Sequence, residues 1–135
     1  MKTIIRLLSV TALLGVLSFS IKQVDYKPFE IALKTSNAKG LAQFFDEQIE
    51  LSILGGEFNI QNSYSRSQAQ TILENFFSEN DVKTFETKHS GQSTWSKYII
   101  GYLQTEDEKY RGLIRYLNSD GKLTIQELEL TLENE

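Results

Sequence analysis

The chain has 135 residues, with 14 basic residues against 18 acidic ones and a net charge of −4 at pH 7. This acidic balance argues against nucleic acid as a partner, because binding to a phosphate backbone is dominated by lysine and arginine. No cysteine is present, which excludes a disulfide framework, a thiolate metal site and a cysteine nucleophile.

The first twenty residues have the features of a cleavable signal peptide. Lys2 and Arg6 give a positive start, and an apolar run follows over residues 7–17. Serines stand at the two positions that a signal peptidase reads, so we expect cleavage before Ile21. The apolar run is shorter than the roughly 20 residues that a membrane-spanning helix needs.

We therefore expect an exported protein, periplasmic or secreted, with a signal peptide over residues 1–20 and a single domain over residues 21–135. The signal peptide holds two of the basic residues and none of the acidic ones, so the mature chain has 12 basic and 18 acidic residues and a net charge of −6. That charge argues against an anionic membrane surface as a partner. The mature length is enough for one domain with a buried core.

Two short helices are expected at the start of the mature chain. Asp25 can cap the first helix, and Pro28 stands in its first turn, where proline is tolerated. Apolar residues then recur at helical spacing. Residues 37–40 interrupt this pattern, and a second short helix is expected over residues 41–45.

The middle of the chain changes from a strand pattern to a helix pattern. Apolar and polar residues alternate over residues 46–54, which indicates a half-buried strand. A glycine pair then turns the chain into a short second strand over residues 57–61. The clearest helix spans residues 65–80, where Ser65 and Gln68 form a capping box ahead of an apolar stripe.

The rest of the chain is expected to form strands joined by short turns. These strands cover residues 82–90, 95–105, 110–117 and 123–132. In the first of them, Phe85, Thr87 and His89 are expected on one face. Asp120-Gly121 is a strong hairpin signal. In the last strand the apolar residues change phase at Gln126-Glu127, which predicts a β-bulge.

Helices grouped early and a late antiparallel meander indicate an α+β fold. Stretches over most of the mature chain resemble a known family, namely residues 36–42, 65–77, 88–91, 100–105 and 125–128. The order of elements resembles the nuclear transport factor 2-like fold, a cone in which N-terminal helices pack on a curved antiparallel sheet. More narrowly, the chain is similar to exported Bacteroidota proteins of domain-of-unknown-function family 4783. No similar stretch is a catalytic signature, so the resemblance implies a fold and a compartment but no activity.

Residues 118–127 look like the later part of a calcium-binding EF-hand loop. Asn118, Asp120 and Glu127 would stand at ligand positions. Tyr116 stands at the first position, however, where it cannot supply a carboxylate. We interpret the segment as a hairpin turn, and we expect no metal site and no cofactor.

The candidate ligand pocket consists of polar and aromatic side chains on and around one late strand. Tyr98, Tyr102 and Gln104 share a face of this strand, and Trp95 and His89 complete the set. Phenols and an amide among apolar side chains suit a pocket that orients a small ligand. The alternative is that these aromatic side chains pack in the core, with each phenol reaching solvent. For His89 a structural hydrogen bond at a turn is preferred to a role as general base, because the sequence names no partner.

Three functions remain open at this point, and the sequence identifies no catalytic residue. The first is noncatalytic binding of a small apolar molecule or of an envelope protein. The second is an isomerase- or dehydratase-type enzyme that uses the cone, and the third is a structural module that forms a homodimer through the curved sheet. A buried carboxylate or histidine in a pocket beside Tyr98 or Tyr102 would favour the enzyme, and an apolar pocket would favour binding. A filled cone with an exposed apolar patch on the sheet would favour assembly.

Overall fold

The computed structural model describes residues 24–134. The signal peptide predicted for residues 1–20 lies outside the described residues. None of the described helices is long and apolar enough to cross a membrane.

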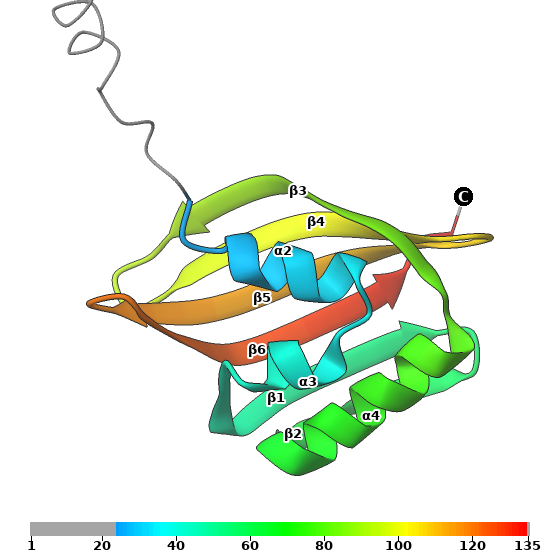
Figure 1. Cartoon of the computed structure of the whole chain (residues 1–135), viewed down its shortest axis with the longest axis horizontal. Coiled ribbons are helices and arrows are strands. Elements are labelled where there is room, and N and C mark those ends of the chain that lie inside the picture. The colour runs from blue at the N-terminus through cyan, green and yellow to red at the C-terminus, as the bar shows by residue number, and fades with distance from the viewer. Residues whose placement is uncertain (1–23, 135) are drawn as a thin grey trace, which may run out of the picture.

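The described residues form three helices and a six-stranded sheet (Figure 1). The sheet has the strand order β2-β1-β6-β5-β4-β3, in which β1 and β6 are parallel and the other neighbours are antiparallel. The helices are α2 (Lys27–Lys34), α3 (Ala38–Ala42) and α4 (Arg66–Glu79), and the strands are β1 (Phe45–Gly55), β2 (Phe58–Ser65), β3 (Val82–Gln92), β4 (Lys97–Thr105), β5 (Lys109–Ser119) and β6 (Lys122–Leu132).

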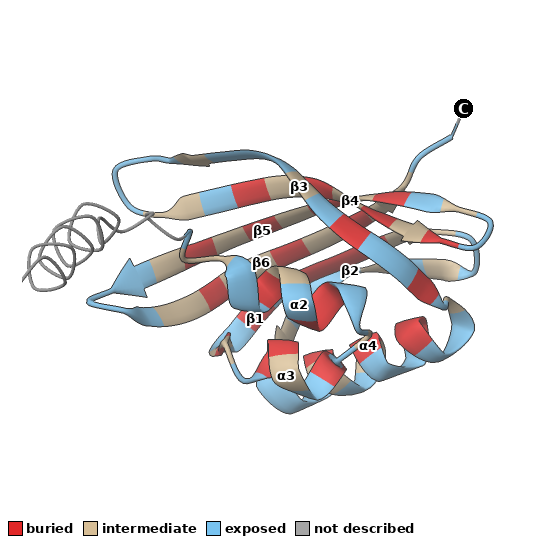
Figure 2. Cartoon of the chain, turned by 45° about the horizontal axis from the view of Figure 1, so that its top comes forward, coloured by how far each residue is buried: buried red, intermediate tan, exposed pale blue. Residues whose placement is uncertain are grey.

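The helices all lie on one side of the sheet, which we call the inner face, and the opposite side is the outer face (Figure 1). Along the central strands, buried residues alternate with partly exposed ones (Figure 2). This alternation is the pattern of a sheet with one face in the core. The α+β arrangement expected from the sequence is therefore the one observed.

Aromatic side chains fill the space between the helices and the inner face. The ring of Phe29 in α2 packs edge-on against Tyr116 of β5 and against Phe44, with ring centroids 5.1 Å and 5.3 Å apart. The ring of Phe76 in α4 packs in the same way against Tyr110, at 5.2 Å. Such edge-to-face pairs stabilise a core beyond the area that they bury. The interior is thus a packed core.

Helix α4 begins as the sequence predicts. The backbone N–H of Gln68 donates to Ser65 Oγ at 3.3 Å, and Gln68 Oε1 accepts from the backbone N–H of Ser65 at 3.1 Å. This reciprocal pair is a capping box, and the prediction is confirmed. Ala69, Leu73 and Phe76 then form the buried stripe of the helix.

The predicted bulge in β6 is also confirmed. Tyr116 lies opposite Ile125, while the preceding residue of β5 lies opposite Glu127, so Gln126 has no partner across the pair. The extra residue returns the apolar positions to the inner face, where Ile125 and Leu128 are both fully buried. This bulge explains the change of phase of the apolar residues in the sequence.

Two predictions for the first helices are wrong. Tyr26 occupies the N-cap position of α2, and no side chain caps this helix. The Asp25 carboxylate instead points to the sheet, where it accepts hydrogen bonds from Lys97, Tyr116 and Asn118. The segment interpreted as an interruption begins α3, because Asn37 Oδ1 accepts from the Gly40 N–H at 2.8 Å and caps it. Phe45, which was assigned to that helix, already belongs to β1.

Strand β3 departs from simple alternation. Its register against β4 shifts between Thr87 and His89. As a result Phe85 and Thr87 face inward, whereas His89 lies opposite Ile100 on the outer face. The prediction that all three residues share a face is therefore wrong, and β3 continues to Gln92 rather than ending at Ser90.

Two glycines create the space that the Phe85 ring occupies. Gly101 of β4 and Gly112 of β5 lie directly opposite each other. A Cβ atom on Gly101 would lie 2.8 Å from the Phe85 ring and would overlap the backbone oxygen of Glu86. A Cβ atom on Gly112 would lie 3.2 Å from the same ring. The first glycine is enclosed by backbone, which cannot yield, and the second mainly by a side chain.

This difference predicts unequal costs for two matched substitutions. Gly101→Ala is expected to lower the free energy of unfolding by about 2 kcal/mol or more, as overpacking against backbone does. Gly112→Ala is expected to cost less than about 1 kcal/mol, because the Phe85 ring can shift slightly. Urea denaturation of both variants measures the two values. Equal losses would contradict the role given to the backbone around Gly101.

Candidate functional site

The structure places three of the predicted ligand residues on the outer face. Tyr98, Tyr102 and Gln104 share one side of β4, as their spacing predicts, while Ile99 and Leu103 on the other side are fully buried. The three side chains therefore face away from the helices and do not line the interior. Their role in binding a ligand stays a prediction.

The other two predicted residues lie on either side of this group. His89 is exposed on the outer face, on the strand next to Tyr98 and Tyr102. Trp95 lies beyond the end of β3, in the turn to β4, and is 84% exposed. Four of the five residues are thus brought to one face, and Trp95 stands at its end.

The outer face also carries charges from two neighbouring strands. Arg115 Nε donates to Glu127 Oε1 at 3.0 Å, and Arg115 Nη1 donates to Gln126 Oε1 at 2.8 Å. Arg111 and Glu129 lie further along the same strands. The pKa of Glu129 is raised, first by burial and then by the adjacent Glu127, while the charge of Arg111 opposes the shift. Both signs of charge therefore occur within one surface.

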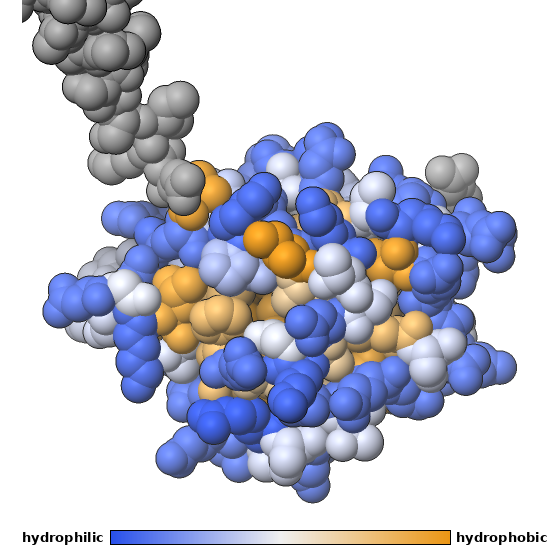
Figure 3. Space-filling view, in the orientation of Figure 1, coloured by the Kyte–Doolittle hydropathy of each residue, from blue (hydrophilic) through white to orange (hydrophobic). Residues whose placement is uncertain are grey.

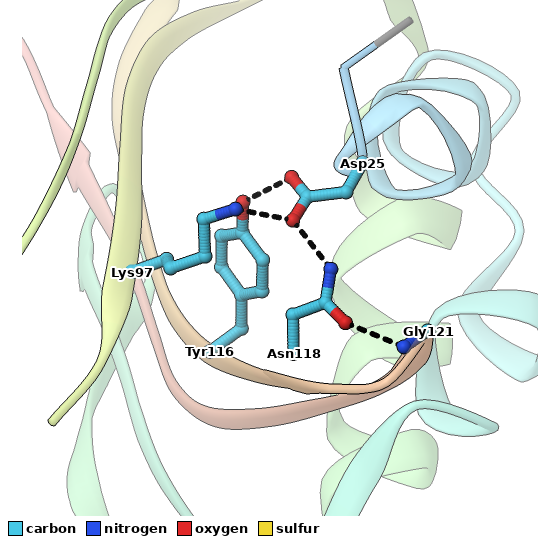
Figure 4. Close-up of polar contacts among 5 residues, drawn as sticks. All are labelled: Asp25, Lys97, Tyr116, Asn118 and Gly121. Carbon is cyan, nitrogen blue, oxygen red and sulfur yellow. Dashed lines mark hydrogen bonds and ion pairs between the residues drawn. The ribbon is translucent and has the colours of Figure 1, made fainter.

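A second polar cluster joins the start of the described chain to the sheet (Figure 4). Tyr116 donates its hydroxyl proton to Asp25 Oδ1 at 2.6 Å. The other oxygen of this carboxylate accepts from Lys97 Nζ at 2.6 Å and from Asn118 Nδ2 at 2.8 Å. Asn118 Oδ1 in turn accepts from the backbone N–H of Gly121 at 2.8 Å, so the β5–β6 turn belongs to the same network.

The Asp25 carboxylate is held in its charged form. Burial alone would raise its pKa, but the hydrogen bonds from Lys97, Tyr116 and Asn118 and the charge of Lys97 together hold the pKa below its ordinary value. Burial, followed by the contact with Asp25, raises the pKa of Tyr116 and keeps the phenol protonated. A carboxylate with three donors and a depressed pKa is a poor general base.

Sequence reasoning missed this network for a simple reason. The partners of Asp25 lie 72 to 93 positions further along the chain, and no local pattern reports such pairs. The nearest sequence signal was the polar hairpin around Asn118, which suggested a turn but gave no hint of its partner.

The hairpin interpretation of residues 118–127 is confirmed. Asp120 and Gly121 have φ angles of 52° and 90°, as a two-residue hairpin turn requires. Asn118 is bound to Asp25 and Gly121, and Glu127 to Arg115. Within residues 24–134, no group of three or more His, Cys, Asp or Glu residues is placed to hold a metal ion.

Two hollows lie on either side of the Asp25 network. One, of about 450 Å³, lies between the β3–β4 turn and the end of β5, and Trp95, Lys97 and Asn118 line it. The other, of about 540 Å³, runs between α2 and α3, and its lining includes Asp25 and Ile31. On this helix side, apolar side chains gather between the helices inside a hydrophilic rim (Figure 3).

The model of the family described as Domain of unknown function (DUF4783) matches residues 27–131. The chain belongs to this family. A DUF4783 family protein from Bacteroides fragilis is 26% identical, with a TM-score of 0.70, over 84% of this chain and 100% of that chain. Another, from Bacteroides uniformis, is 22% identical, with a TM-score of 0.71, over 81% of this chain and 97% of that chain.

A wider comparison establishes the fold. An NTF2-like protein of unknown function from Shewanella baltica is 9% identical, with a TM-score of 0.60, over 82% of this chain and 90% of that chain. At that identity the likeness concerns the fold alone. The expected DUF4783 membership and the NTF2-like fold are both confirmed. No curated protein matches the chain.

The Asp25 network predicts a pH-dependent contribution to stability. Asp25→Asn is expected to lower the free energy of unfolding by about 2 kcal/mol at pH 7, because charge-assisted hydrogen bonds are lost and Lys97 keeps no counter-ion. The folded pKa of Asp25 lies below its ordinary value near 3.8. The stabilisation is therefore complete above that value and is lost as the pH falls through the folded pKa. Urea denaturation of both proteins between pH 7 and strongly acidic pH measures the effect.

Asp120→Asn is the matched control, because Asp120 is exposed in the hairpin turn and asparagine tolerates its backbone conformation. We expect this variant to follow wild type at every pH. An unchanged stability for Asp25→Asn at neutral pH, or a deficit that persists in strong acid, would contradict the assignment.

Proposed function

We propose that the domain is a noncatalytic assembly module of the cell envelope, whose outer face binds a second copy of the chain. The observation that carries the proposal is the contrast between the two faces of the sheet. The inner face is covered by helices and packed with aromatic rings, whereas the described helices leave the outer face open.

The filled interior supports a noncatalytic role. Phe29, Phe76, Tyr110 and Tyr116 are all fully buried and occupy the space that a substrate would need. The carboxylate at its margin, Asp25, is already bound by three donors. Tyr98 and Tyr102 face the other way, so the arrangement that would have favoured an enzyme is not found among residues 24–134.

The apolar content of the outer face supports protein binding. Ile100 and Leu113 lie opposite each other at the centre of β4 and β5. Tyr98 and Tyr102 flank this pair along β4. Lys109 Nζ lies 4.4 Å from the centroid of the Tyr102 ring, in a cation–π contact. Aromatic side chains and arginine are enriched in protein interfaces. This surface therefore has the composition of a contact surface.

The charges of the outer face favour a second copy as the partner. Arg111 and Arg115 lie on β5, and Glu127 and Glu129 lie beside them on β6. A two-fold contact brings the same patch of both copies together. The two arginines of each copy can then face the two glutamates of the other copy. Burial and then the adjacent Glu127 raise the pKa of Glu129, and an arginine of the second copy would offset the repulsion between the two glutamates.

A substitution at the centre of the outer face tests the assembly. Wild type is expected to be a dimer, measured by light scattering after size-exclusion chromatography. Leu113→Lys is expected to weaken the dimer by about 30-fold or more, since it places an extra charge at the centre of the contact. Ile31→Lys is the control, because Ile31 is exposed on α2, on the opposite side of the molecule.

Two results would overturn the assembly proposal. One is a wild-type monomer at all concentrations up to about 100 μM, a range in which even weak specific dimers are populated. The other is a dimer that Ile31→Lys disrupts and Leu113→Lys leaves intact, because the contact would then lie on the helix side.

The envelope location is a part of the proposal that rests on the sequence of residues 1–20. The protein purified from its own cells is expected to begin at Ile21, as mass spectrometry of the intact chain would report. Ser20→Arg is expected to block processing, because a signal peptidase requires a small residue before the cleavage site. A cytoplasmic chain that retains Met1 would contradict export.

A further inference from the structure

Trp95 is exposed to solvent in the hydrogen-bonded turn between β3 and β4. It is the single tryptophan of the chain, and its exposure of 84% exceeds that of Val24, Ile31 and Tyr98. At the base of the turn, the Ser93 N–H donates to the Ser96 backbone oxygen at 2.8 Å, and Ser93 Oγ donates to the same oxygen at 3.3 Å. The indole is therefore presented outward and adds nothing to the packing of the core.

Trp95 is one of the residues that line the hollow of about 450 Å³ at this end of the sheet. That size lies within the range of small-molecule sites, roughly 300–1,000 Å³. Most of the other walls carry hydroxyl or amide groups, from Gln92, Ser93, Thr94, Ser96, Asn118 and Ser119. The hollow thus combines one large flat apolar surface with many uncharged polar groups.

The charge within the hollow is already neutralised. Its cation, Lys97, lies 2.6 Å from the Asp25 carboxylate, and Asn118 binds the same carboxylate (Figure 4). An anionic ligand needs an unpaired cation. A cationic ligand needs a carboxylate or several aromatic faces, and the lining offers a single aromatic ring. The hollow is therefore suited to a neutral ligand with many hydroxyl groups.

We propose that this hollow binds a neutral saccharide, with one sugar ring stacked on the Trp95 indole. A pyranose ring has an apolar face of C–H groups and a rim of hydroxyls, which matches an indole face bordered by amides and hydroxyls. Gln92 and Asn118 supply the amides. This site is separate from the proposed dimer contact, because Trp95 lies in the turn beyond the strands.

The side-chain amide of Asn118 is already oriented before a ligand binds. Its amide is oriented by Asp25 on one side and by the Gly121 N–H on the other. Each amide atom keeps one further hydrogen-bonding position, since the nitrogen carries two protons and the oxygen two lone pairs. Groups fixed in this way lose little entropy on binding.

The single tryptophan makes the site directly observable by its fluorescence. The full mature chain is titrated with maltotriose, cellotriose and chitotriose as neutral probes, and with glucuronate and inorganic phosphate as charged ones. At least one neutral trisaccharide is expected to give a saturable change with a Kd below about 10 mM, the weak end of specific affinities. No saturable change with any of the three, or tighter binding of glucuronate or phosphate, would overturn the proposal.

Three variants then locate the binding. Gln92→Ala is expected to weaken the affinity about tenfold through a lost hydrogen bond. Gln61→Ala, at an exposed position on β2, is the control and is expected to bind as wild type does. Trp95→Ala, followed by calorimetry because the fluorophore is gone, is expected to abolish binding while the circular dichroism spectrum stays unchanged. Full binding by Trp95→Ala, or equal losses in the two glutamine variants, would overturn the proposal.

The same variants separate a saccharide site from a protein contact. If Trp95→Ala dissociates the dimer but binds saccharide normally, the indole belongs to an interface between chains and the saccharide proposal fails. If Leu113→Lys is monomeric and still binds saccharide, the two surfaces act independently, as the structure predicts.

Discussion

The hydrogen bond between Asp25 and Tyr116 joins the start of the described chain to the centre of the sheet. The phenol of Tyr116 would otherwise be buried without an acceptor, which is costly in a core. Once its hydroxyl is fixed, the ring supports Phe29 edge-on, and Phe29 supports Phe44. The backbone oxygen of Phe44 accepts from the Ile125 N–H at 2.6 Å, beside the bulge of β6. One contact therefore links the first helix to β5, β6 and the start of β1.

The same interaction limits what the interior can do. A carboxylate that neutralises a lysine and accepts from a phenol and an amide has little basicity left for proton abstraction. The aromatic rings that it holds in place also occupy the space inside the cone. In this member of the DUF4783 family, the outer face and the ends of the sheet remain available to partners.

Features that depend on neighbouring residues could be predicted from the sequence. The capping box of Ser65 and Gln68, the Asp120-Gly121 hairpin and the bulge at Gln126 all follow from patterns a few residues long. Features that depend on distant partners could not. Asp25 was expected to cap a helix, because its position just before a helical pattern is typical of a cap. Its three actual partners lie in the second half of the chain, where no local pattern points to them. His89 was expected on the same face as Phe85 and Thr87, because the sequence of an alternating strand does not reveal a register shift.

The register shifts of β3 have a further consequence, because this strand and β2 form the two edges of the sheet. An edge strand offers a row of free N–H and C=O groups to any other chain, which is a route to fibrils. In β3 the shifts break that row, and Lys83 and Lys88 add charge beside it. Growth by strand addition is therefore discouraged. A contact through the outer face would instead close on two copies.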